Sequence, residues 1–199
     1  MGRAPPVNRR QIVLQDALAF ELHVIELAKT PLAARALTTG ATATLTHGSA
    51  EFVAQEEMGR SEGYWWSPDS QSLAYQETDE SAVQIRHIAD PLHPDAAPTT
   101  FAYPAAGTTN ATVRLGVIAR TGGATRWLNW DAAKFPYLTR VVWRETDAPL
   151  TVSVMDRAQQ TALLLRADPA TGATTELVRD TDPAWVNLDE RGGFPRWLP

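Results

Sequence analysis

The sequence predicts an all-β fold: a partial β-propeller of about three four-stranded antiparallel blades, with a short helical insertion that carries two adjacent glutamates. Three observations support this prediction. A hairpin with a tryptophan recurs, since Trp66 and Leu73 are seven positions apart around a Pro-Asp-Ser turn and Trp143 and Leu150 repeat that separation. A second hairpin type with a glycine or proline turn alternates with the first. Several of the short strands show the apolar alternation typical of half-buried β-structure.

The first element in chain order is an expected partial blade at residues 11–38. Within it, Leu22–Leu27 is a predicted strand, Lys29–Pro31 a turn and Arg35–Thr38 the returning strand. An insertion is expected at 39–63, between this partial blade and the first tryptophan hairpin.

Residues 64–128 are expected to form the next blade. Its tryptophan hairpin supplies two strands, Val113–Ala119 alternates as a half-buried strand does, and Thr125–Leu128 returns after a Gly-Gly turn. The stretch 79–110 contains four prolines and is expected to be an excursion from this blade.

A further blade is expected at 138–178. The second tryptophan hairpin provides its first two strands, and Ala162–Arg166 and Thr175–Val178 form another hairpin around the turn Asp168–Gly172. Residues 185–199 end in a Trp-x-Pro sequence like the one that opens the blade at 64–128, and so they are expected to start one more blade.

The repeat has consequences for the whole protein. Because closed propellers typically have ~4–8 blades, the chain is expected to be a segment of a longer protein, and its exposed blade faces favour a homodimer. The alternative fold is a single β-sandwich, which also has short strands and regular turns. A sandwich does not require tryptophans at matched positions, so the repeat favours the propeller. Four tryptophans are predicted to be blade-packing residues rather than a ligand cage: Trp65, Trp66, Trp143 and Trp197.

Composition excludes several classes of function. The 199 residues have a net charge of −5 and their 18 Lys and Arg are scattered, so no nucleic-acid partner is expected. There is no cysteine, which excludes disulfides, thiolate metal sites and cysteine nucleophiles. No apolar run is long enough to cross a bilayer, and no glycine-rich loop leads into a helix. Neither a membrane span, a metal nor a cofactor is expected.

The sequence assigns no catalytic residue. The nucleophile pattern G-x-S-x-G is missing, and His47 and Ser49, in the nearest stretch, are interpreted as loop residues. His87 and His93 stand near two aspartates, but the prolines around them predict an ordinary loop rather than a metal site.

Two adjacent carboxylates, Glu56 and Glu57, precede the first tryptophan hairpin. Adjacent glutamates are usually the solvated face of a short helix. Here, however, the run Glu51-Phe-Val-Ala-Gln-Glu-Glu-Met58, followed by Gly63-Tyr-Trp-Trp-Ser-Pro-Asp69 and Leu73-Ala-Tyr75, closely resembles the propeller segment of the dipeptidyl peptidase IV family of serine peptidases, in the prolyl oligopeptidase group. Further matches are Tyr103–Gly107, Val113–Val117, Leu163–Asp168 and Pro183–Asn187, so the resemblance covers roughly 45–199.

The resemblance implies a propeller that caps an α/β-hydrolase domain containing Ser, Asp and His. It also implies that Glu56 and Glu57 bind the free N-terminus of a peptide substrate, with Gln55 where many relatives have a third acid. The parent would then be a serine dipeptidyl aminopeptidase that releases N-terminal dipeptides with Pro or Ala at the second position. The hydrolase domain is absent from this sequence, and the chain alone is expected to be inactive.

Two function hypotheses follow. The first is the substrate-gating and N-terminus-recognising propeller part of such a peptidase, whose partners are peptides with a free N-terminus and the hydrolase domain of the same parent chain. The alternative is a noncatalytic propeller module that binds peptides or proteins. The compartment stays open between a periplasmic or exported parent and a cytoplasmic one.

Overall fold

The computed structural model describes residues 11–15, 20–28, 30–144, 148–188 and 197, and only the backbone of 11–15. The elements of this part, nearly all strands, are β1 (Gln11–Gln15), β2 (Leu22–Glu26), β3 (Ala34–Ala36), β4 (Leu45–His47), α1 (Phe52–Glu57), β5 (Tyr64–Trp66), β6 (Ser72–Asp79), β7 (Ile85–Ile88), β8 (Thr99–Ala102), β9 (Thr112–Ala119), β10 (Arg126–Trp127), β11 (Tyr137–Val142), β12 (Leu150–Met155), β13 (Thr161–Ala167) and β14 (Thr174–Thr181). Among these residues no helix is long and apolar enough to cross a membrane.

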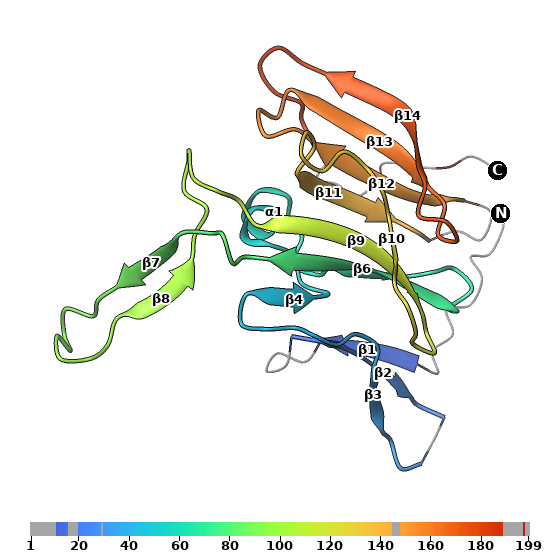
Figure 1. Cartoon of the computed structure of the whole chain (residues 1–199), viewed down its shortest axis with the longest axis horizontal. Helices are drawn as coiled ribbons and strands as arrows, with labels where there is room; N and C mark the ends of the chain where they lie inside the picture. Colours follow the sequence, from blue (N-terminus) through green and yellow to red (C-terminus); the bar gives the residue numbers. More distant parts are fainter. Residues whose placement is uncertain (1–10, 16–19, 29, 145–147, 189–196, 198–199) are drawn as a thin grey trace.

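Apart from the two-stranded sheet β7-β8, the strands form three antiparallel sheets that follow one another in sequence and lie side by side (Figure 1). The first sheet has the order β1-β2-β3, the second β10-β9-β6 with β4 and β5 on the other side of β6, and the third β11-β12-β13-β14. No barrel closes among the described residues. The all-β, partial propeller fold with its short helix is thereby confirmed. The hairpin β7-β8 projects away from the second sheet, within the proline-containing stretch 79–110 (Figure 1).

The helix lies between two strands that share one edge of β6. β5 pairs with residues 73–75 of β6, and β4 pairs with residues 77–79 of the same strand. The chain leaves this edge after β4 and returns at β5, and a bridge between Ser49 and Glu62 closes the base of the excursion. The strand before α1 and the strand after it are therefore both anchored on β6.

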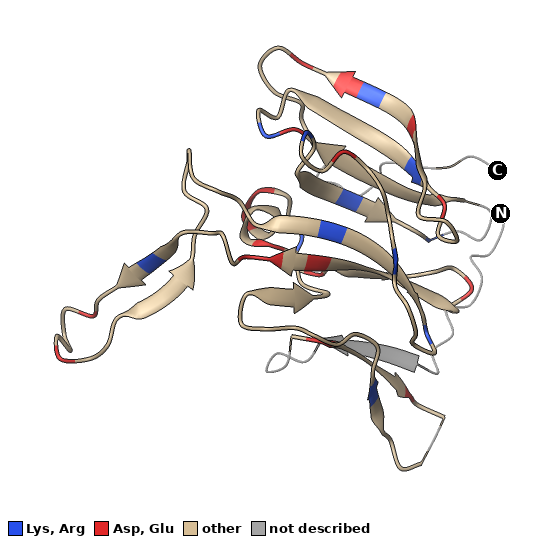
Figure 2. Ribbon diagram, viewed as in Figure 1, with Lys and Arg blue, Asp and Glu red and all other residues tan. Residues whose placement is uncertain are grey.

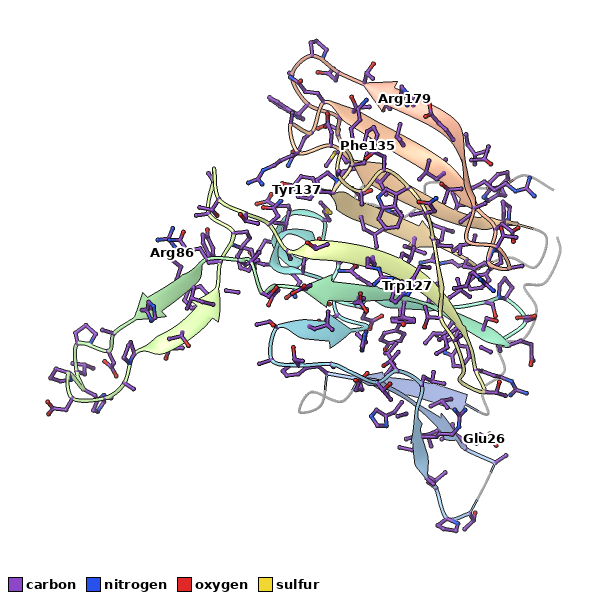
Figure 3. All side chains as sticks on the ribbon, viewed as in Figure 1. Glu26, Arg86, Trp127, Phe135, Tyr137 and Arg179 are labelled. Atoms are coloured by element: carbon purple, nitrogen blue, oxygen red, sulfur yellow. The ribbon has the colours of Figure 1, made fainter. Side chains whose placement is uncertain are left out.

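Two apolar cores lie between the sheets. Because side chains alternate along a strand, β6 and β9 contribute to both. Leu73 and Ile118, which are opposite each other in the register, face the first sheet, whereas Ala74 and Val117 face the third. Tryptophans pack against both cores: Trp65, Trp130 and Trp143 against the one on the third-sheet side, and Trp66 and Trp127 against the one on the first-sheet side (Figure 3 labels Trp127).

Trp197 also meets the third sheet, since its Nε1 donates a hydrogen bond to Thr151 Oγ1 over 3.0 Å. The packing role predicted for Trp65, Trp66 and Trp143 agrees with these contacts. Of the expected further blade at 185–199, residues 189–196 and 198–199 lie outside the described residues.

A charged cluster joins the first sheet to the second. His47 is buried, its Nδ1 lies 2.8 Å from a carboxylate oxygen of Glu21, and its Nε2 lies 3.3 Å from a carboxylate oxygen of Glu77. Arg114 donates to the other oxygen of Glu77 over 3.0 Å and lies 3.7 Å from the centroid of the Trp127 ring. Figure 2 shows the acidic and basic residues next to each other on β6 and β9. The interpretation of His47 as a loop residue is wrong, because it ends β4 and both of its ring nitrogens contact carboxylates that are distant in the sequence.

We expect Glu21→Gln to make the chain's stability less dependent on pH. Burial raises the pKa of Glu21, but hydrogen bonds from Thr38, from the Ala41 N–H and from His47 outweigh it, so the pKa lies below its ordinary value of 4.5. A carboxyl whose pKa is lower in the folded state stabilises the fold above its unfolded pKa, and this contribution is lost as the pH falls through the folded pKa. The variant should therefore be about 1–2 kcal/mol less stable near pH 7.

Urea denaturation at several pH values measures this effect. The difference between the wild type and Glu21→Gln should shrink as the pH falls below 4.5 and through the lower pKa of folded Glu21, because below that pKa both chains carry a neutral side chain at this position. Glu62→Gln, at an exposed position outside the cluster, is the matched control and should change the stability by less than about 0.5 kcal/mol. A difference that stayed constant down to about pH 3 would contradict the assignment.

Candidate functional site

Helix α1 is short and depends on the sheets that hold it. Six residues are too few for a helix to be stable alone, so tertiary contacts must maintain it. Ala54 is fully buried, and Val53 and Met58 pack against a cluster that contains Tyr137 and Met155 of the third sheet (Figure 3 labels Tyr137). One face of the helix thus packs on the third sheet, and its C-terminal end is left at the surface.

Glu56 and Glu57 occupy this C-terminal end, and both are exposed. The carbonyl groups at a helix C-terminus carry partial negative charge, and no basic residue stands in the last turn of α1. Two carboxylates at this end are unfavourable for the helix itself. The same arrangement adds negative potential at this end of the helix.

Both glutamates line an open cleft of about 580 Å³ between α1 and β11. Trp65 of β5 and Arg60, in the connection between α1 and β5, contribute to its wall, as do Arg140 of β11 and Arg144. A smaller and more apolar cavity of about 190 Å³ adjoins Glu57 and Met58 and extends over β11–β14. Glu57 therefore stands at the border between a polar cleft and an apolar cavity.

Arg60 connects the end of α1 to two sheets. Gly59 has a φ of 57°, in the left-handed region that glycine tolerates, and it turns the chain directly after the helix. The Arg60 side chain is 12% exposed. Its Nη1 donates to Gln76 Oε1 over 2.8 Å and to the Glu62 carbonyl over 3.2 Å, while Nη2 donates to the Leu138 carbonyl over 2.8 Å.

Glu51 completes this buried polar cluster. It stands at the N-cap of α1, yet its side chain makes no capping hydrogen bond. One of its carboxylate oxygens accepts a hydrogen bond of 2.6 Å from Gln76 Nε2 and lies 3.8 Å from Arg60 Nη2. Glu51, before α1, and Arg60, after it, thus both form hydrogen bonds with the side chain of Gln76, which is fully buried on β6. The sequence predicted no role for Arg60 or Gln76; the only local signal is the Gly-Arg pair that follows the helix.

The other residues considered from the sequence do not join this site. Gln55 is exposed, and its Nε2 donates to the Ala50 carbonyl over 2.7 Å, at the opposite end of the helix from the glutamate pair. His93 Nδ1 lies 2.7 Å from Asp90 on an exposed turn. Within the described part of the chain, no group of three or more His, Asp or Glu is placed to hold a metal ion.

Comparison with known protein families gives one match over most of the chain. The sequence model described as "Dipeptidyl peptidase IV (DPP IV) N-terminal region" matches residues 17–196. This range includes all three sheets except β1, and it includes α1 with both glutamates.

Individual relatives agree with this match. Mouse dipeptidyl peptidase 8 is 29% identical over 133 residues, which cover 56% of this chain and 15% of that protein. Rat inactive dipeptidyl peptidase 10 is 27% identical over 163 residues, which cover 77% of this chain and 20% of that protein. The crystal structure of Porphyromonas gingivalis dipeptidyl peptidase 4 superposes with a TM-score of 0.76 at 23% identity, over 88% of this chain and 25% of that one. The chain thus spans a quarter or less of the length of these proteins.

Proposed function

The chain belongs to the dipeptidyl peptidase IV family, of which it carries N-terminal propeller sequence, and we propose that Glu56 and Glu57 bind the α-ammonium group of a peptide's free N-terminus. The observation that supports this most is their position. Both carboxylates are exposed at the C-terminal end of a short helix, where the helix dipole adds negative potential, and both line one open cleft.

The chemistry of a peptide N-terminus suits this position. Its amino group has a pKa of about 7.7–8.0, and two nearby carboxylates favour the charged form. The ammonium presents three N–H donors, and two adjacent carboxylates can accept more than one of them. A peptide whose amino group is acylated has neither the charge nor these donors, so the site distinguishes free from blocked N-termini.

The proposed activity belongs to the whole protein. A hydrolase domain of the same parent chain would supply Ser, Asp and His, and the glutamate pair would fix one end of the peptide at a set distance from the serine. Such a spacing permits the release of a dipeptide and disfavours cleavage at internal bonds. Pro or Ala at the second position is the preference implied by the family resemblance.

A second candidate function is a noncatalytic module that binds peptide N-termini. The match to a relative named inactive dipeptidyl peptidase 10, over 77% of this chain, supports this second candidate. The reading frame of the whole gene separates the two candidates. A G-x-S-x-G nucleophile motif followed by Asp and His supports the peptidase, and a reading frame with the hydrolase domain but without that serine supports the binding module.

The 199-residue chain alone is expected to show no labelling by a fluorophosphonate probe. Among the described residues, His47 has both ring nitrogens directed at carboxylates, so it cannot activate Ser49 as a nucleophile. The measurement is intact-mass spectrometry after incubation with the probe, with the full-length protein as the positive control for the peptidase. Stoichiometric labelling of any serine in the 199-residue chain would overturn this expectation.

A further inference from the structure

The polar cluster of Glu51, Arg60 and Gln76 under α1 is costly to bury. Glu51 and Gln76 are 5% and 0% exposed, and Arg60 is nearly as buried. One carboxylate oxygen of Glu51 and the Nε of Arg60 are buried without any hydrogen-bond partner. Burial lowers the pKa of Arg60 below its ordinary value, and the nearby Glu51 charge partly offsets this effect.

Stability alone does not explain such a cluster. A buried ion pair is often no more stabilising than apolar side chains of the same volume, since the loss of hydration offsets the attraction. Here the two charged groups are 3.8 Å apart and each leaves one atom unpaired, so the pair is far from ideal. What the cluster does provide is geometry, because the planar guanidinium donates in fixed directions.

These directions fix the end of α1. The guanidinium of Arg60 binds the Gln76 side chain on β6, the Leu138 carbonyl on β11 and the Glu62 carbonyl before β5. Arg60 follows Glu57 by three residues, and its backbone N–H donates to the Ala54 carbonyl over 3.1 Å. Any shift of the last helical turn would have to break or stretch these hydrogen bonds.

We infer that Arg60, with Glu51 and Gln76, is a positioning residue that holds the carboxylates of Glu56 and Glu57 at a fixed place in the cleft. This inference rests on the proposed function of the glutamate pair. It assigns to Arg60 no contact with the peptide. The expected effect of removing Arg60 is therefore weaker recognition of the free amine with little change in the reactivity of the distant serine.

The test uses the full-length protein and two readouts. The first is kcat/KM on a free-amine dipeptide chromogenic substrate such as Ala-Pro-p-nitroanilide. The second is the rate constant for labelling of the active-site serine by a fluorophosphonate, which needs no amine recognition. Arg60→Met should lower kcat/KM by about 10-fold or more and leave the labelling rate within about twofold, because only the ammonium site is displaced. Arg60→Lys keeps the charge but loses the planar guanidinium with its several donors, and should show an intermediate decrease of kcat/KM.

Arg114→Met is the matched control. Like Arg60, Arg114 forms an ion pair with a glutamate and lies over a tryptophan ring, but it is on the first-sheet side of the second sheet and lines neither cavity. The variant should leave both readouts unchanged. A decrease of kcat/KM and labelling rate together in Arg60→Met would indicate a general structural role and would overturn the inference, as would unchanged values of both.

Hydrogen exchange of the chain gives a readout that does not depend on activity. In Arg60→Lys, amides of residues 54–58 should exchange faster while those of β12 and β13 keep their protection. If Arg60→Met does not fold, this measurement and the kinetics of Arg60→Lys decide. Unchanged exchange in the helix would refute positioning. Failure of the proposed function has a different signature: Gln replacements of the two glutamates would then have no kinetic effect, whereas the helix would still loosen in Arg60→Lys.

Discussion

Glu56→Gln or Glu57→Gln in the full-length protein is expected to lower kcat/KM on a free-amine dipeptide substrate by about 10–100-fold. Each carboxylate makes a charge-assisted hydrogen bond to the ammonium in the proposed complex, worth about 1.5–3 kcal/mol. Glutamine keeps the size and one acceptor oxygen but removes the negative charge. Because both side chains are exposed, neither replacement should change the stability of the fold.

The controls for this experiment lie in the same segment. Glu62→Gln removes an exposed carboxylate that lines neither cavity, and should leave kcat/KM within about twofold. The labelling rate with a fluorophosphonate should be unchanged in all three variants. If both Gln variants hydrolyse the free-amine substrate as fast as the wild type, Glu56 and Glu57 are only the solvated end of a helix and the proposed function is wrong.

The general fold was predictable because local patterns determine it. Trp66 and Leu73, seven positions apart, are direct partners in the register of β5 and β6. The alternation in Val113–Ala119 corresponds to a strand that faces two different cores with its two sides. Such patterns depend on neighbouring residues and on turn chemistry, and one sequence is enough to detect them.

The contacts that position the site were not predictable in the same way. His47 meets Glu21 and Glu77 at separations of 26 and 30 residues, and Arg60 reaches the Leu138 carbonyl 78 residues away. Neither residue has a distinctive local pattern, since their roles depend on how the sheets stack. The glutamate pair was found only because its surrounding motif resembles a known family.

Gly172→Ala is expected to be among the most destabilising single substitutions in this chain. Gly172 lies in the turn between β13 and β14, where its N–H donates to the Asp168 carbonyl over 2.8 Å and its φ is 81°. Its carbonyl accepts a hydrogen bond of 2.8 Å from the Asn129 N–H, just beyond β10 of the second sheet. The turn thus joins the second and third sheets at this end of the molecule.

A methyl group at Gly172 would collide with the carbonyl oxygen of Trp127, which is backbone and cannot rotate away. The left-handed φ adds about 1–2 kcal/mol for a residue with a Cβ, and the overpacking adds about 1–3 kcal/mol. We therefore expect a loss of about 2–5 kcal/mol in the free energy of unfolding, a large fraction of the ~5–15 kcal/mol typical of a domain.

Gly107→Ala separates these two contributions. Its φ of 80° is almost the same, but a Cβ at this position would have no atom within 4 Å, so only the backbone cost remains. Urea denaturation of both variants measures the difference, which should be about 1–3 kcal/mol and should come from the contact between the two sheets. If the two variants lose the same stability, the turn at Gly172 does not pack on Trp127 as described.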